Sequence, residues 1–411
     1  MLANLATPLL AMADAAILGH LPNVSFLAAL SIASGIFAYI LWGFNCISLS
    51  CSTFTGNANA SNDSQLINNR LYQYVFIAFI TSIILFIILQ LSIDPLLSLI
   101  NISENLKKHV LTYLKIMSFS IMPLLFIQVA ISWFTGLKQP KIALYVLLIS
   151  SSINIVLDII FVFILNMDIN GVALASVIAQ FITALFVFLF ILNYQKNNLS
   201  INNINRSIWL NNEKVFSFGG TLLLRSGVLL SVFLLFNLKG ASISENTVAA
   251  NALLMTILIL ISSVLDATAS SAQVQLANKS LKQHSILSST FFIMSLFVLG
   301  FILVIFIFGH YYLTLMSNQS TVILLAGEYL PWMVLLCITS CSSYWLDGVF
   351  LGWHKSKWMR NSVLISACLV YFPLLLNFDL SNHQLWLSLN VFMIIRSLCM
   401  WFYFIKKTKY S

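Results

Sequence analysis

The chain has 411 residues, of which 60% are hydrophobic and only 8% are charged. Soluble domains carry about 25% charged residues, so these proportions exclude a water-soluble globular protein. The formal net charge of +8 suits either a nucleic-acid-binding or a membrane protein, and the positions of the basic residues decide between the two.

Apolar segments long enough to cross a bilayer recur along nearly the whole sequence. About 20 helical residues span a hydrocarbon core of about 30 Å, and helices are required because lipid offers no partner to backbone polar groups. The first segment is predicted to be an uncleaved helix rather than a signal peptide, since no positive charge precedes it. Twelve spans are predicted, at residues 2–20, 26–52, 71–93, 110–134, 141–165, 169–193, 215–238, 247–272, 285–309, 321–351, 358–378 and 384–405.

One stretch rich in Asn, Ser and Lys divides these spans into two groups of six. We therefore predict a six-helix N-terminal lobe at 1–193, a cytoplasmic linker at 194–214 and a six-helix C-terminal lobe at 215–411. The predicted fold class is an all-α polytopic membrane protein. Because six is even, the two lobes would be related by a pseudo-twofold axis along the membrane normal.

An internal repeat supports this division. Phe134-Thr135-Gly136 matches Phe350-Leu351-Gly352 at an offset of 216 residues, and Leu148-Ile149-Ser150 matches Leu364-Ile365-Ser366 at the same offset. A weaker match joins Leu27-Ala28-Ala29 to Val248-Ala249-Ala250. Duplicated lobes are typical of carriers that alternate access around one binding site.

The basic residues predict the orientation. With a cytoplasmic N-terminus, the outer loops hold only Lys107, Lys108 and Lys239, and three more basic residues lie within spans. The remaining fourteen of the twenty lie in inner loops or the C-terminal tail, which predicts that both termini are cytoplasmic. The positive charge then reflects topology and anionic lipid rather than a nucleic-acid partner. These fourteen are Arg70, Lys138, Lys141, Lys196, Arg206, Lys214, Lys279, Lys282, Lys355, Lys357, Arg360, Lys406, Lys407 and Lys409.

The sequence offers no constellation for covalent chemistry. No G-x-x-x-x-G-K-[ST] phosphate loop and no H-E-x-x-H zinc motif occur, and the six histidines stand singly near span ends. We therefore expect no enzyme, no cofactor and no metal site.

Four acids fall inside predicted spans: Asp14, Asp158, Asp266 and Asp347. An ionised carboxylate at mid-span costs about 2.5–3.5 kcal/mol on the insertion scale, so such residues usually serve a function. Asp14, Asp158 and Ser176 are predicted to lie roughly 10 Å below the outer surface, and Asn154 shares a helix face with Asp158. These four residues form the predicted cation-coupling site; interhelical hydrogen bonds that hold the bundle together are the alternative interpretation.

A second polar cluster is predicted in the inner part of the C-terminal lobe, from Arg225, Asp266 and Asp347. Arg225 and Asp266 lie at equal predicted depth, which permits an ion pair. Gln128 and Arg396 are single polar residues, for which packing or lipid contact is expected.

Five motifs are distributed over nearly the whole chain. They are Asn4-Leu5-Ala6-Thr7-Pro8-Leu9-Leu10, Ala13-Asp14-Ala15-Ala16-Ile17-Leu18-Gly19-His20-Leu21, Asn154-x-x-x-Asp158, Gly171-Val172-Ala173-Leu174-Ala175-Ser176 and Leu346-Asp347-Gly348-Val349-Phe350-Leu351-Gly352. Together they resemble the MATE family of multidrug exporters, in particular its DinF-like branch. Ser176 stands where a Thr is common, which keeps the hydroxyl, and Gln273 stands where the family leads us to expect an acid.

The resemblance implies a gradient-driven antiporter in a bacterial inner membrane, monomeric, with small organic molecules and membrane lipid as partners. Asp14, Asn154, Asp158 and Ser176 would correspond to the family's cation-coupling pocket. The expected activity is export of hydrophobic, cationic drugs or metabolites in exchange for protons or sodium ions.

A flippase for lipid-linked saccharides of the same superfamily is the alternative, and should present several Arg or Lys side chains to pyrophosphate. An intramembrane enzyme and a solute channel are further alternatives; the first lacks a catalytic constellation, and the second does not explain the duplicated lobes.

The topology gives a first testable prediction. A reporter protein fused after Ser411 should lie in the cytoplasm, because the basic residues crowd the loops on that side. Fluorescence of a cytoplasm-active reporter, compared with activity of a reporter that functions only outside the membrane, measures this directly. An external C-terminus would overturn the orientation.

Overall fold

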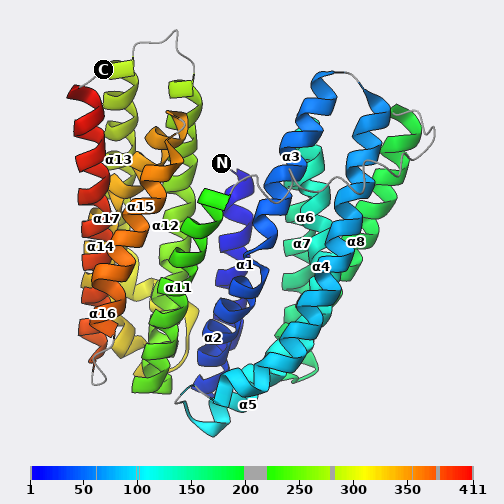
Figure 1. Ribbon diagram of the computed structural model, residues 1–411. Coiled ribbons are helices and arrows are strands. Elements are labelled where there is room, and N and C mark those ends of the chain that lie inside the picture. Colours follow the sequence, from blue (N-terminus) through cyan, green and yellow to red (C-terminus); the bar gives the residue numbers. More distant parts are fainter. Residues whose placement is uncertain are drawn as a thin grey trace. The chain divides into compact units, whose positions relative to one another are not determined.

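The computed structural model describes residues 2–61, 63–98, 100, 102–198, 220–277, 283–353, 355–375 and 380–409 as a set of mostly long helices (Figure 1). The predicted linker begins within the last turn of α8, and its residues 199–214 lie outside the described ranges. The elements are α1 (Leu2–Gly19), α2 (Val24–Leu41), α3 (Phe44–Ala60), α4 (Ser64–Ser98), α5 (Glu104–Met117), η1 (Ser118–Ser120), α6 (Ile121–Gly136), α7 (Pro140–Ile159), η2 (Ile160–Ile164), α8 (Asp168–Asn198), α11 (Gly220–Ile243), α12 (Glu245–Ala277), α13 (Gln283–Met316), α14 (Ser320–Gly352), α15 (Ser356–Ser366), η3 (Ala367–Tyr371), α16 (Phe372–Leu375) and α17 (Asn382–Lys409).

The predicted spans correspond to these helices. Among the described residues, 11 helical segments are long and apolar enough to cross a membrane, and the shorter apolar helix Pro8–Gly19 lies at the first predicted span. Large apolar side chains such as Phe306 and Leu91 are 86% and 74% exposed, which suits a surface that faces lipid rather than water. The predicted fold class, an all-α polytopic membrane protein with the two-lobe plan, is confirmed.

One predicted span is wrong in its detail. Residues 26–52 do not form one helix, because α2 ends at Leu41 and α3 begins at Phe44. Gly43 lies in the break, where glycine favours helix interruption, and the Trp42 indole donates to the Leu223 carbonyl oxygen at 3.0 Å. Apolar windows could not reveal this break, since the sequence is apolar on both of its sides.

The chain packs as two compact units. One comprises residues 36–223, and the other comprises 3–35 together with 224–411. Thus α1 and the first part of α2 pack with the C-terminal helices. Their contacts include the Ser317 hydroxyl donating to the Gly19 carbonyl oxygen at 2.9 Å and the Asn237 amide donating to the Ser31 carbonyl oxygen at 3.3 Å. The lobes predicted from the repeat, 1–193 and 215–411, are a separate division and stay a prediction.

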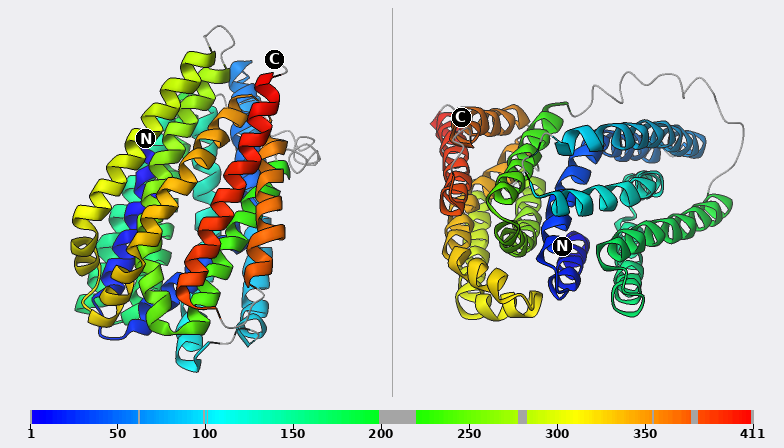
Figure 2. Two further views of the ribbon diagram at one scale, coloured as in Figure 1. Left: turned by 90° about the vertical axis from the view of Figure 1, so that its left-hand side faces the viewer. Right: turned by 90° about the horizontal axis from the view of Figure 1, so that it is seen from below.

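In the unit of 36–223, α6 packs against α3, α4, α7 and α8. Trp133 on α6 is fully buried and its indole donates to the Ile67 carbonyl oxygen on α4 at 3.2 Å. In the other unit, α14 packs against α12, α13 and α17, and both views of Figure 2 show α17 beside α14. The buried amides of Asn251 and Asn382 donate to each other at 2.8 and 3.0 Å, which ties α12 to α17.

The internal repeat is reproduced in the backbone hydrogen bonds. At the end of α6, the Leu137 amide donates to Trp133 and the Gln139 amide donates to Phe134, at 3.0 and 2.9 Å. At the end of α14, Trp353 donates to Val349 and Lys355 to Phe350, at 3.0 and 2.8 Å. Every position in the second set is offset by 216 residues from the first, so the matched sequences adopt the same helix end.

The glycine of each repeat is required by a close helix contact. A Cβ atom on Gly136 would lie 2.6 Å from the Ser52 carbonyl oxygen on α3, and one on Gly352 would lie 2.9 Å from the Gln273 carbonyl oxygen on α12. A methyl group therefore fits at neither position without moving the neighbouring backbone. The repeat thus preserves the same helix-to-helix contact in both halves of the chain.

These contacts predict that Gly136→Ala and Gly352→Ala each lower stability by about 1–3 kcal/mol through overpacking. Gly300→Ala is the matched control, because nothing lies within 4 Å of a Cβ at this helical position of α13. There, Ala should be neutral or stabilising, since it favours helix. Thermal unfolding in detergent measures all three. Equal melting temperatures for Gly136→Ala and Gly300→Ala would contradict the proposed contact.

Candidate functional site

The first candidate site lies in the unit of 36–223, where α7 and α8 pack together. Asp158 and Asn154 on α7 are 0% and 3% exposed, and they lie one helical turn apart on the same face. Ser176 on α8 lies opposite them. The structure therefore brings together three of the four residues predicted for cation coupling.

The Asn154 amide connects the other two side chains. In the orientation that gives each amide atom a complementary partner, the nitrogen donates to Asp158 Oδ2 at 3.0 Å, and the oxygen accepts from Ser176 Oγ at 3.0 Å and from the Ser176 backbone amide at 3.1 Å. Ser176 thus fixes the amide, and the amide presents a donor to the carboxylate. Such a donor can stabilise the carboxylate without neutralising its charge.

Local irregularity in the backbone positions this group. Directly after Asp158 the helix widens into the π turn η2, where the Leu165 amide donates to the Ile160 carbonyl oxygen at 3.0 Å. Turns of this kind are frequent at functional sites. The tight connection to α8 then depends on Gly171, whose Cβ position would lie 3.2 Å from atoms of Phe161 and Met167. This close packing sets Ser176 at the level of Asn154.

Asp14 lies on α1, in the other packing unit, and is partly buried. Its expected proximity to Asp158 therefore stays a prediction. In the same unit as Asp158, the buried Gln128 Oε1 and Thr183 Oγ1 atoms have no hydrogen-bond partner among the described residues. Thr183 follows Ser176 by seven residues, two helical turns along α8, and this spacing was the sequence signal that could have identified it.

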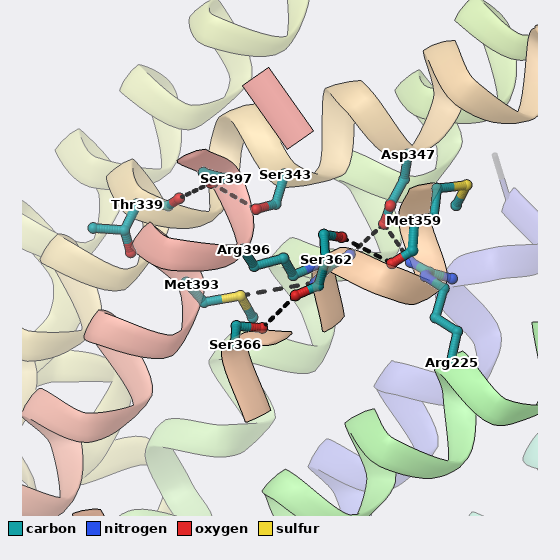
Figure 3. A network of polar contacts seen from close by, with 10 residues as sticks. All are labelled: Arg225, Thr339, Ser343, Asp347, Met359, Ser362, Ser366, Met393, Arg396 and Ser397. Carbon is teal, nitrogen blue, oxygen red and sulfur yellow. Dashed lines mark hydrogen bonds and ion pairs between the residues drawn. The ribbon is translucent and has the colours of Figure 1, made fainter. Parts of the chain in front are cut away.

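The second cluster lies in the other unit and is an ion-pair triad. Arg225 on α11 and Arg396 on α17 both donate to the same oxygen of Asp347 on α14, as Figure 3 shows. Asp347 and Arg396 are buried, with side chains 7% and 2% exposed, and Arg225 is 19% exposed. The second oxygen of Asp347 has no partner among the described residues. Two guanidinium groups on one carboxylate leave the triad with a formal charge of +1.

Asp266 completes the charge balance of this cluster. Its carboxylate interacts electrostatically with Asp347, Arg225 and Arg396, but forms no ion pair among the described residues. Gly348 allows this proximity, because a Cβ there would lie 2.8 Å from the Ala269 Cα atom of α12. The predicted secondary cluster of Arg225, Asp266 and Asp347 is therefore present, with Arg396 as a fourth member.

Two details of the sequence prediction are wrong here. Arg225 forms its ion pair with Asp347 rather than with Asp266, because its guanidinium group reaches the Asp347 oxygen that Arg396 also binds, and Asp266 interacts with this group only electrostatically. Arg396 is not a packing or lipid-contact residue but a buried partner of Asp347. The cost of an arginine inside the membrane was the signal for a partner, although the sequence did not show which acid supplied it.

Metal-ligand geometry is not found among the described residues, where no three His, Cys, Asp or Glu side chains come together. In the first cluster the Asp158 carboxylate accepts a hydrogen bond from an amide, and in the second the Asp347 carboxylate is paired with two guanidinium groups.

Comparison with known proteins places these sites in a family context. The MatE family profile matches residues 1–160. The chain is 27% identical to DNA damage-inducible protein F of Escherichia coli over 96% of this chain and 87% of that protein. It is 25% identical to the probable multidrug resistance protein NorM of Photorhabdus laumondii, over 88% and 81% of the two chains. The solved inward-facing structure of a multidrug resistance MATE family transporter superposes with a TM-score of 0.81 at 15% identity, covering 98% of this chain and 96% of that one.

The triad predicts strong energetic coupling between Asp347 and Arg396. Removing the charge of Asp347 leaves two cations unpaired, one of them fully buried, and should destabilise the protein by about 3–5 kcal/mol. Combining Asp347→Leu with Arg396→Met should recover part of this loss. Thermal unfolding of the two single variants and the double variant gives the coupling energy.

The matched control is the same cycle on Arg225 and Asp266, using Arg225→Met and Asp266→Leu. These two side chains form no ion pair, so their effects should be much closer to additive. Additive effects for Asp347 and Arg396, or stronger coupling between Arg225 and Asp266, would contradict the triad.

Proposed function

The chain belongs to the MATE (multidrug and toxic compound extrusion) family of efflux transporters, and from this premise we propose that it is an antiporter that exports hydrophobic cationic compounds in exchange for protons. The observation that carries the proposal is Asp158, a fully buried carboxylate that accepts a hydrogen bond from the Asn154 amide, which Ser176 holds in place. A buried charge needs a compensating partner. A proton and a cationic cargo molecule can each supply it.

Coupling follows from this competition. When Asp158 is ionised, a cationic cargo molecule gains an electrostatic partner; when it is protonated, that partner is lost. Binding of the cargo and binding of the proton therefore oppose each other, and thermodynamic linkage makes the opposition reciprocal. Protonation from the outer side would release cargo there, and loss of the proton to the cytoplasm would restore the site. We propose Asp14 as the second carboxylate of this exchange, with Asn154 and Ser176 positioning Asp158.

The donor set favours a proton over a sodium ion. The Asn154 oxygen is already engaged by the Ser176 hydroxyl and backbone amide, and the Asn154 nitrogen faces Asp158. A cation would need further oxygen ligands beyond this group, whereas a proton needs only the Asp158 carboxylate. Hard cations require several oxygen ligands.

The flippase alternative is less well supported. A site for a lipid-linked pyrophosphate needs available cationic side chains. Arg225 and Arg396 are both held by Asp347, so neither is free to bind phosphate without first losing its own partner. We also propose that the protein lies in a bacterial inner membrane with both termini in the cytoplasm. The distribution of the basic residues supports this orientation.

The proposal predicts that Asp158→Asn abolishes proton-driven export. Asparagine retains the size and a hydrogen-bonding group but cannot exchange a proton. Purified protein in liposomes, loaded with a fluorescent organic cation and given a pH gradient, should transport at the rate of protein-free liposomes. Folding is checked by thermal unfolding, which should change little because the Asn154 contact can be retained.

Asp94→Asn is the matched control, since Asp94 is 57% exposed and pairs with Lys115 at 3.3 Å. It should transport as the unmodified protein does. A sodium gradient imposed without a pH gradient should not drive export. Wild-type rates for Asp158→Asn would exclude the coupling role of this residue, and sodium-driven export would exclude protons as the required coupling ion.

A further inference from the structure

A polar group on the outside of α14 and α17 is separate from both clusters described above. The His383 imidazole, near the start of α17, lies with Nε2 2.9 Å from Glu328 Oε1 on α14. The Trp332 indole donates to His383 Nδ1 at 3.0 Å, and the Tyr329 ring lies edge-on to the imidazole with centroids 4.9 Å apart. His383 and Glu328 are 49% and 53% exposed.

These hydrogen bonds fix the charge of the group. An indole nitrogen can only donate, so His383 Nδ1 must accept and therefore carries no proton. The single imidazole proton lies on Nε2 and is donated to Glu328. The imidazole is then neutral, and the Glu328 carboxylate keeps a full negative charge. Among the described residues no Lys or Arg forms an ion pair with it.

The group lies among exposed apolar side chains. On α14, Glu328 shares one helix face with Leu324, Leu335 and Ile338, which are 72%, 39% and 54% exposed. On α17, His383 shares a face with Leu387 and Leu398, which are 45% and 62% exposed. Exposed apolar side chains on membrane-spanning helices suit a surface that faces lipid.

The group of Glu328 and His383 lies at the depth of the lipid headgroups. The 33 residues of α14 make a helix about 50 Å long, which exceeds the hydrocarbon thickness of about 30 Å. Glu328 lies about 12 Å from the end of this helix, close to the boundary between acyl chains and headgroups. His383 lies at the matching end of α17.

A negative charge at this boundary, flanked by aromatic rings, has the chemistry of an ammonium site. A carboxylate accepts charge-assisted hydrogen bonds, and the rings of Trp332 and Tyr329 attract a cation through their faces. A primary ammonium group can donate hydrogen bonds to Glu328, whereas a choline group has no donor. We infer that Glu328, Trp332 and His383 form a binding site for the ethanolamine headgroup of a phosphatidylethanolamine molecule on the lipid-facing surface of α14 and α17.

Native mass spectrometry of the full chain in detergent tests this inference. Phosphatidylethanolamine, phosphatidylcholine and phosphatidylglycerol with identical acyl chains are titrated separately. The unmodified protein should bind the ethanolamine lipid about tenfold more tightly than the other two, as expected for one charge-assisted contact. Glu328→Gln should abolish this preference. Glu104→Gln is the matched control, since Glu104 is 88% exposed and pairs with Lys107 at 2.9 Å, and it should retain the preference.

A second variant tests the inference independently, in case Glu328→Gln does not fold. His383→Lys places an ammonium group of the chain itself beside Glu328, and should remove the preference for the ethanolamine lipid while preserving the helix contact. Equal affinity for the three lipids in the unmodified protein, or a preference that survives Glu328→Gln or His383→Lys, would overturn the inference. Displacement of the bound lipid by tetraphenylphosphonium, a cation with no donor, would assign the site to organic cations instead and would also overturn it.

Discussion

A carboxylate inside a bilayer must have its charge compensated, because neither lipid nor the packed helices can hydrate it. The two packing units meet this requirement in different ways. Asp347 is compensated permanently by the guanidinium groups of Arg225 and Arg396. Asp158 accepts a hydrogen bond from the Asn154 amide, which Ser176 holds in place. The proposed function assigns the exchangeable charge to this hydrogen-bonded carboxylate rather than to the ion-paired one.

The same asymmetry assigns a different task to the C-terminal cluster. Arg225, Asp347 and Arg396 come from α11, α14 and α17, so one carboxylate oxygen joins three helices. Breaking a buried ion pair is costly because it leaves an uncompensated charge. The cluster therefore holds its helices together, whereas the exchangeable charge is proposed to lie on Asp158 of the α7 and α8 pair.

The duplicated sequence preserves packing rather than chemistry. Gly136 and Gly352 occupy the same close helix contact, and the hydrogen bonds at the two helix ends correspond one to one. At the offset of the repeat, Asn154 and Asp158 correspond to Val370 and Leu374, which carry no polar group. The two halves thus retained a common backbone while their polar side chains diverged, as expected if a duplicated scaffold later acquired one ion-exchanging site.

The sequence by itself determined the helices and their order, because a span requires about 20 apolar residues and each such run is visible without tertiary information. It also identified the unusual acids, because a carboxylate inside the membrane is costly whichever residue is its partner. The contact of Asn154 with Asp158 followed from helical periodicity, a local property. Only the tertiary structure decided that Arg225 and Arg396 share Asp347, that α2 ends before Trp42, and that α1 packs with the C-terminal helices. These depend on helix lengths and on contacts between segments distant in the chain, such as Gly348 against Ala269, and neither composition nor periodicity encodes them.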